Sequence, residues 1–405
     1  MSSSSAFKLH RPLAVAIVHC LKDILEDQRP VDKVLEKCFK ANPKFGKRDR
    51  GFIAENVYDI TRHYIAIAYS VPLNDEIWSI LGAWLIINKY PLPDWKEFKE
   101  LDSKIIIPTY REGLKTEYIK YSIPVDLDLF GKEQLGDRWY QELEAMHHPA
   151  HMILRVNTIK SDTPQVVDYL DKILVRYKVL QNKNAIAVDQ RINLFSSQIF
   201  KDGWVEVQDY ASQQVGVFVQ AKSGDRIIDA CAGGGGKALH LAALMQNKGR
   251  IIALDVEANK LENLKKRTRR AGVQIVEARW IENNKVIKRL EGQADKLLLD
   301  VPCSGSGVLR RNPDAKYRIT PDYVKNLVEV QRDILQNYSR MVKPDGELIY
   351  VTCSLFPLEN ETQIHTFLES NPDFKFVEDQ HLWPSEFGYD GFYMARLKKL
   401  VNKPA

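Results

Sequence analysis

Two cysteines of this chain lie in matching sequence contexts that suit thiol chemistry. Cys303 and Cys353 each follow a short apolar run, and each is followed by a serine in a polar turn. Ligands of an open α/β sheet bind at the carboxyl ends of its strands, so two thiols at such ends would reach one rim. A cysteine nucleophile needs partial exposure and a stabilised thiolate. The paired placement favours a chemical role for both thiols without ranking them, whereas Cys20 and Cys38 are expected to fill core positions.

A glycine loop joining a predicted strand to a predicted helix is the second chemical signal. Residues 225–237 read DRIIDACAGGGGK, and Gly233, Gly235 and Ala238 fit the spacing of the dinucleotide-binding fingerprint. Glycines let the backbone approach a ligand closely, and a helix N-terminus favours anions. A phosphate-binding P-loop is excluded, because Cys231 replaces a required glycine and Ala238 replaces the Ser/Thr that would hold magnesium.

An acidic residue follows this loop at a spacing that suits a nucleoside-bearing cofactor. Asp255 ends the predicted strand 251–254, where a carboxylate binds ribose hydroxyls in dinucleotide-binding folds. Nicotinamide cofactors and S-adenosylmethionine both carry an adenosine ribose, so the loop and Asp255 do not separate them. A glycine turn with a helix-capping acid is the simpler alternative. The positions expected to hold a cofactor are Cys231, Ala232, Gly233, Gly234, Gly235, Gly236, Lys237, Asp255 and Asp300.

The elements around these residues predict an α/β fold preceded by helices. From residue 225 onward, apolar runs alternate with helical stretches, which is typical of a doubly wound parallel sheet. Apolar positions recur at helical spacing before residue 145, and short strand-like runs follow with a helix that opens at Thr163. The sequence therefore predicts three domains: an all-α domain (1–145), a small α+β module (146–220) and a Rossmann-like domain (221–402).

Composition indicates which partners, cysteine chemistry and cellular location the sequence favours. The 405 residues are 44% hydrophobic and 27% charged, and the net charge of +5 is compatible with a nucleic-acid partner without demonstrating one. Five scattered cysteines without a Cys-x-x-Cys pair argue against a disulfide framework or a metal site. The apolar stretch 13–21 is followed at once by Lys22 and Asp23, and no run reaches the ~18 apolar residues of a membrane span. We expect a cytoplasmic, monomeric protein that does not enter a membrane.

Several segments resemble the RNA 5-methylcytosine methyltransferases of the Nop2/Sun family. The matching motifs are Asp229-Ala230-Cys231-Ala232 with Gly235-Gly236-Lys237, Leu299–Gly305, Arg311–Lys316, and Val351–Ser354 with Pro357, Glu359, Asn360 and Glu361. The paired Pro-Cys-Ser and Thr-Cys-Ser motifs are far more specific than the glycine loop. The resemblance covers about residues 150–400, and residues 47–62 resemble more weakly the NusB-type helical domain of the bacterial ribosomal RNA (RsmB-like) branch.

The resemblance implies a function and a division of roles. S-adenosylmethionine would be the cofactor and RNA the partner, with 16S ribosomal RNA as the expected substrate. Cys353 would attack carbon 6 of a cytosine and Cys303 would assist release, while Asp300 would bind the base and Lys237 would sit between cofactor and base. Two departures from the family pattern stand out. Gly234 replaces a usual proline, and no acid after the third predicted strand aligns with the family's cofactor-binding acid.

Other functions stay open at this level. A nicotinamide-dependent oxidoreductase would use the loop and Asp255 but would leave both cysteine motifs idle. A transfer RNA cytosine-5 methyltransferase would share every motif, and a non-catalytic RNA-binding ribosome-assembly factor would keep the fold without methyl transfer. The basic cluster 265–270 is expected to be a solvated helix face. The candidates for RNA contact are Arg310, Arg311, Lys316, Arg318, Arg155, Asn157 and Lys160.

Overall fold

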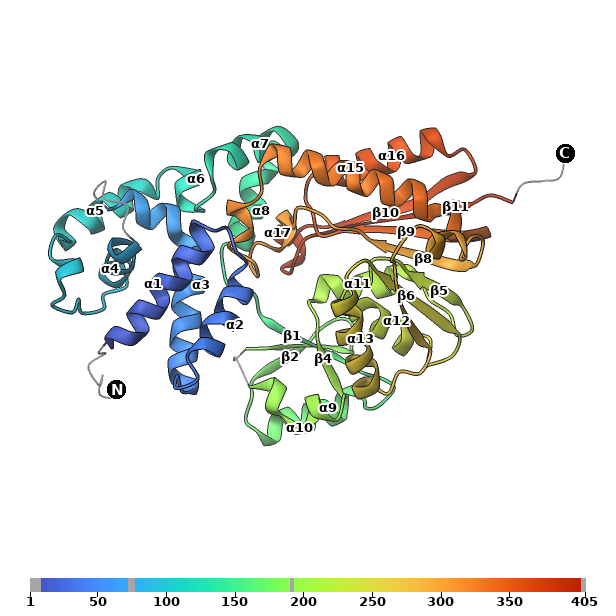
Figure 1. Cartoon of the computed structure of the whole chain (residues 1–405), viewed down its shortest axis with the longest axis horizontal. Helices are drawn as coiled ribbons and strands as arrows, with labels where there is room; N and C mark the ends of the chain where they lie inside the picture. The colour runs from blue at the N-terminus through green and yellow to red at the C-terminus, as the bar shows by residue number, and fades with distance from the viewer. Residues whose placement is uncertain (1–8, 72–76, 190–192, 402–405) are drawn as a thin grey trace. The chain divides into compact units, whose positions relative to one another are not determined.

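The computed structural model describes residues 9–71, 77–189 and 193–401 (Figure 1). The chain forms two compact units, of which the first takes Met1–His148 with Leu309–Tyr323 and the second takes Pro149–Val308 with Val324–Ala405. The division into three domains, with boundaries near residues 145 and 220, stays a prediction. Within the described ranges, no helix is both long and apolar enough to cross a membrane.

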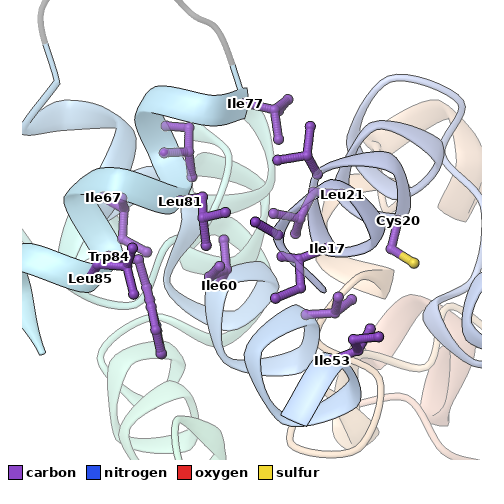
Figure 2. Close-up of a cluster of buried hydrophobic side chains, with 14 of the residues drawn as sticks. Ile17, Cys20, Leu21, Ile53, Ile60, Ile67, Ile77, Leu81, Trp84 and Leu85 are labelled. Atoms are coloured by element: carbon purple, nitrogen blue, oxygen red, sulfur yellow. The ribbon is translucent and has the colours of Figure 1, made fainter. Parts of the chain in front are cut away.

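The first unit is helical, as the spacing of its apolar residues predicts. Figure 2 shows its core, where Ile17 and Leu21 pack with Ile60 and Leu81. Residues three and four apart share a helix face, so these positions bury one stripe of each helix. Its helices are α1 (Arg11–Leu25), α2 (Val31–Ala41), α3 (Lys47–Tyr69), α4 (Ile77–Ile87), α5 (Ser103–Gly113), α6 (Glu117–Lys120), α7 (Val125–Leu135) and α8 (Arg138–Met146).

A small antiparallel sheet opens the second unit. Its strands are β1 (Met152–Val156), β2 (Tyr177–Val179), β3 (Ala185–Val188) and β4 (Val205–Val207), in the order β2-β3-β1-β4. Its helices are α9 (Thr163–Lys172) and α10 (Gln198–Lys201). Helix α9 begins where the sequence predicts, because Asp162 and Gln165 form a reciprocal capping box at its start.

A larger sheet forms the rest of the second unit, in the order β10-β11-β9-β8-β5-β6-β7. Strands β9, β8, β5, β6 and β7 pair in parallel, and β11 and β10 add antiparallel pairs at one edge. The strands are β5 (Arg226–Asp229), β6 (Arg250–Asp255), β7 (Val276–Trp280), β8 (Ala294–Asp300), β9 (Val342–Thr352), β10 (Phe374–Leu382) and β11 (Phe392–Lys399). The doubly wound parallel sheet is confirmed.

Helices cover both faces of this sheet (Figure 1). Successive strand residues point to opposite faces, so Ile227 packs with α11–α13 whereas Ile228 packs with α14–α16. The helices are α11 (Tyr210–Val219), α12 (Gly236–Leu244), α13 (Ala258–Ala271), α14 (Lys285–Lys288), α15 (Pro321–Tyr338), α16 (Glu361–Ser370) and α17 (Pro384–Phe387).

The order of the strands reverses next to β5. From β5 the chain adds β6 and β7 on one side, then returns to add β8 and β9 on the other side. In doubly wound sheets, the ligand binds outside the carboxyl ends of the strands at such a switch point. Asp229 ends β5 and Asp300 ends β8, so the fold places these two carboxyl groups at the position where a ligand is expected.

Candidate active site at the carboxyl ends of the strands

The two motif cysteines meet at the ends of adjacent parallel strands. Cys303 follows β8 and Cys353 directly follows β9. Their Sγ atoms lie 3.1 Å apart, and the backbone N–H of Cys353 donates a hydrogen bond to Sγ of Cys303 at 3.2 Å. Both cysteines are half-buried and free. A disulfide bond would bring the two sulfur atoms to about 2.05 Å, so the observed distance shows two separate thiols. The structure thus joins two thiols that lie 50 residues apart in the sequence.

The environment of Cys303 favours the protonated form of its thiol. The hydrogen bond with Cys353 and burial of the thiol together raise the pKa of Cys303 well above its ordinary value. A thiol that keeps its proton is a poor nucleophile, because the thiolate is the reactive form. Cys303 is therefore suited to keep its proton, and the choice of Cys353 as nucleophile stays what the family resemblance implies.

Lys237 and Asp300 form an ion pair beside these thiols. Nζ of Lys237, the second residue of α12, donates to Oδ2 of Asp300 at 2.6 Å. Burial works against the charged ammonium, but attraction to Asp300, with smaller contributions from Cys353 and Asp229, outweighs it and raises the pKa of Lys237. Lys237 therefore stays charged at neutral pH, and a nearby positive charge favours a thiolate.

The glycine loop has the backbone conformations that its sequence predicts. Gly235 precedes α12 with a φ of +80°, and a Cβ there would lie 2.7 Å from Cγ of Leu264. Gly233 also has a positive φ, of +53°, and a Cβ there would meet nothing within 4 Å. The loop therefore leaves open space above Gly233 while Gly235 packs against α13, and this combination suits close approach of a ligand to the backbone.

Asp255 holds the glycine loop in place. Its Oδ2 accepts a hydrogen bond from the backbone N–H of Gly233 at 2.7 Å, and its Oδ1 accepts one from Glu257 at 2.8 Å. A carboxylate oxygen has two lone pairs, so each oxygen of Asp255 retains the capacity to accept a further hydrogen bond from a ligand hydroxyl. The structure is therefore compatible with the predicted ribose contact and adds a structural role for Asp255.

Asp229 is a site residue to which the sequence reasoning gave no role. Its side chain is buried, and within the described structure neither carboxylate oxygen has a hydrogen-bond partner of good geometry. Burial, together with repulsion from Asp300, raises its pKa to about 7. A buried acceptor without a partner next to an open glycine loop fits a ligand that brings its own donor, such as an ammonium group. Its position at the end of the strand before the loop was the available signal.

Two predicted RNA contacts of the segment after Cys303 are wrong. Lys316 is 3% exposed, and its Nζ donates to the backbone carbonyls of Arg62 and Tyr121. Arg310 is also buried and donates to the carbonyl of Ala145. All of these residues belong to the first unit, so the two side chains stabilise its interior and are not available to phosphates. Arg318 is partly exposed and pairs with Asp314.

The residues predicted to guide RNA in the small sheet also have structural partners. Arg155 is buried and donates to Gln208 and to the carbonyl of Gly236, the first residue of α12. The side chain of Asn157 donates to the carbonyls of Gly203 and Ala271. Lys160 is exposed and donates to the carbonyl of Asp202. Arg155 and Asn157 therefore join the small sheet to helices α12 and α13, and their prediction as RNA contacts is wrong.

The chain is similar in sequence to known proteins. Residues 217–398 match the family described as 16S rRNA methyltransferase RsmB/F. The ribosomal RNA small subunit methyltransferase B of Pasteurella multocida is 35% identical over 282 residues, which cover 65% of this chain and 62% of that protein. The protein of the same name from Shewanella oneidensis is 31% identical over 299 residues, which cover 71% of this chain and 69% of that protein.

A solved structure extends the similarity beyond the large sheet. The crystal structure of PH0851 is 26% identical to this chain, with a TM-score of 0.81, and the match covers 97% of this chain and all of that one. By contrast, the chain spans only 60–63% of the length of the first relatives that it matches.

Proposed function

Because this chain belongs to the family of RsmB/F 16S rRNA methyltransferases, we propose that it transfers a methyl group from S-adenosylmethionine to carbon 5 of a cytosine in ribosomal RNA. The observation that carries the choice of reaction is the thiol pair, with Cys303 Sγ and Cys353 Sγ 3.1 Å apart beside the ion pair of Lys237 and Asp300. A nicotinamide-dependent oxidoreductase would leave both thiols without a role.

The residues around the glycine loop would hold the cofactor. The backbone of the loop and the carboxylate of Asp255 suit the adenosine ribose, and the unpartnered carboxyl of Asp229 suits the ammonium group. When bound, S-adenosylmethionine supplies an electrophilic methyl group for carbon 5 of the base.

Cys353 is the nucleophile in the proposed reaction. Its thiolate attacks carbon 6 of an unpaired or extruded cytosine, which forms a carbon–sulfur bond and makes carbon 5 nucleophilic. The ammonium of Lys237 stabilises the thiolate, and Asp300, held by Lys237, binds the edge of the cytosine ring. The ring is thereby activated by residues of this chain alone.

Cys303 acts when the product leaves. After methyl transfer, loss of the proton from carbon 5 restores the double bond and expels the sulfur of Cys353 from carbon 6. Cys303 has a raised pKa and therefore carries its proton, 3.1 Å from the departing sulfur. A hydrogen bond from that thiol stabilises the Cys353 thiolate as it leaves.

Trapping experiments test this division of roles. Cys303→Ala incubated with ribosomal RNA and S-adenosylmethionine should accumulate a covalent protein–RNA adduct that survives a denaturing gel. Cys353→Ala should give no adduct and no methyl transfer, and Cys38→Ala, which changes a half-buried thiol of the first unit, should behave like the wild type. Methyl transfer by Cys353→Ala, or the adduct appearing in Cys353→Ala instead of Cys303→Ala, would contradict the proposal.

A further inference from the structure

Glu359 is a fully buried acid that the proposed chemistry does not use. It lies in the turn between β9 and α16, and its side chain accepts hydrogen bonds from both cysteine motifs. Oε1 accepts from the backbone N–H of Ser304 at 2.8 Å and from Nε2 of Gln331 at 2.9 Å. Oε2 accepts from Oγ of Ser304 and from Oγ of Ser354, each at 2.5 Å.

These bonds tie together the residues that directly follow the two thiols. Ser304 follows Cys303, and Ser354 follows Cys353, so one carboxylate fixes both turns. Gln331 of α15 extends the network, because its Nε2 also donates to the carbonyl of Pro302, the residue before Cys303. Hydrogen bonds to a charged acceptor are about twice as strong as neutral ones, so this buried group restrains the turns strongly.

We propose that Glu359 is the positioning residue that holds the Cys303 and Cys353 turns together and so sets the distance between the two thiols. This inference rests on the proposed function for its catalytic consequence, but not for its geometry. A small misplacement of reacting groups can lower a rate about 100-fold, so loss of this restraint should affect the chemical step. Glu359 touches neither thiol by a hydrogen bond and therefore acts through Ser304 and Ser354.

The charge of Glu359 has a second consequence for the thiol pair. The groups shown to interact electrostatically with the Cys303 thiol are Cys353, Glu359 and Tyr350. After the contributions of Cys353 and burial, repulsion from the Glu359 carboxylate further raises the pKa of Cys303. Glu359 therefore helps to keep the proton on the thiol that assists release.

The variant Glu359→Gln separates positioning from a merely structural role. It keeps the size of the side chain but removes its charge and one acceptor for the serine hydroxyls. We expect kcat to fall about 10- to 100-fold while KM for RNA stays within about 3-fold of the wild type. In the protein alone, the pH midpoint for alkylation of Cys303 by iodoacetamide, read by mass spectrometry of its peptide, should move to lower pH. Loosened turns without an electrostatic role would speed alkylation at every pH and leave the midpoint in place.

Matched variants complete the test. Glu369→Gln changes an exposed acid of α16 and should leave both readouts unchanged, while Ser304→Ala keeps the charge and should lower kcat without moving the midpoint. An unshifted Cys303 midpoint and a wild-type kcat in Glu359→Gln would overturn the proposal. The alkylation readout needs neither RNA nor cofactor, so it fails or succeeds independently of the proposed function. If Glu359→Gln does not fold, wild-type kcat in both Ser304→Ala and Ser354→Ala would overturn the proposal.

Discussion

Burial sets the character of the ionisable groups at the rim of the large sheet. The pKa of Asp229 is raised to about 7 because its carboxyl group is buried and lies near Asp300. Lys237 is buried as well, yet its pKa is raised, because its ammonium is attracted to Asp300 and donates a hydrogen bond to that carboxylate at 2.6 Å. The charged form of Asp229 is therefore disfavoured in this site, and a positively charged ligand group next to it would stabilise the carboxylate.

The variant Asp229→Asn tests the raised pKa of Asp229 through the dependence of stability on pH. The pKa of Asp229 is 3.8 in the unfolded chain and about 7 in the fold, so its contribution is fully present below 3.8 and is lost as the pH rises through about 7. Between about pH 5 and pH 8, the free energy of unfolding of the wild type should fall by about 2–3 kcal/mol relative to that of Asp229→Asn. Urea unfolding at both pH values measures this difference in unfolding free energy. Parallel pH profiles of stability for the two proteins would contradict the prediction.

The glycine loop joins β5 to α12 and is the element that we propose to hold the cofactor. Gly235→Ala should disrupt it, because the new Cβ would lie 2.7 Å from Cγ of Leu264 in a backbone conformation with φ of +80°. We expect a loss of about 2–4 kcal/mol in unfolding free energy, combining the left-handed conformation with overpacking. Calorimetry with S-adenosylhomocysteine should show weaker binding as well.

Gly234→Ala is the matched control for the loop. Gly234 does not have a positive φ, and the nearest atom to a Cβ there would be Nη1 of Arg267 at 3.3 Å, which is not backbone. This variant should keep the stability of the wild type. Equal effects of the two substitutions would show that the shape of the loop does not depend on Gly235.

The sequence predicted the strands and the loop of the site better than the long-range contacts of individual side chains. Strand ends, the glycine loop and the meeting of Cys303 with Cys353 follow from local apolar runs and from the rule that parallel strands end at one edge. The burial of Lys316 could not be predicted in this way. Its partner Arg62 lies 254 residues away in sequence, and nothing in the local spacing around Lys316 indicates that contact. The network of Glu359 was missed for the same reason, although the residue itself lay in a matched motif.

At the scale of the whole molecule, the motifs support the proposed reaction but do not indicate which RNA would be its substrate. The chain carries a net charge of +5, which suits a polyanionic partner, and two of the basic residues nearest to Cys303 in sequence are buried in the first unit. Recognition of the proposed RNA substrate must therefore depend on residues other than Arg310 and Lys316.

Bisulfite sequencing of total RNA from cells with and without the gene tests the central claim most directly, because 5-methylcytosine resists conversion. We predict that a cytosine of 16S ribosomal RNA is protected when the gene is present and converted when it is deleted. The wild-type gene should restore protection, and a gene encoding Cys353→Ala should not. An identical conversion pattern with and without the gene, or a change confined to transfer RNA, would contradict the assignment.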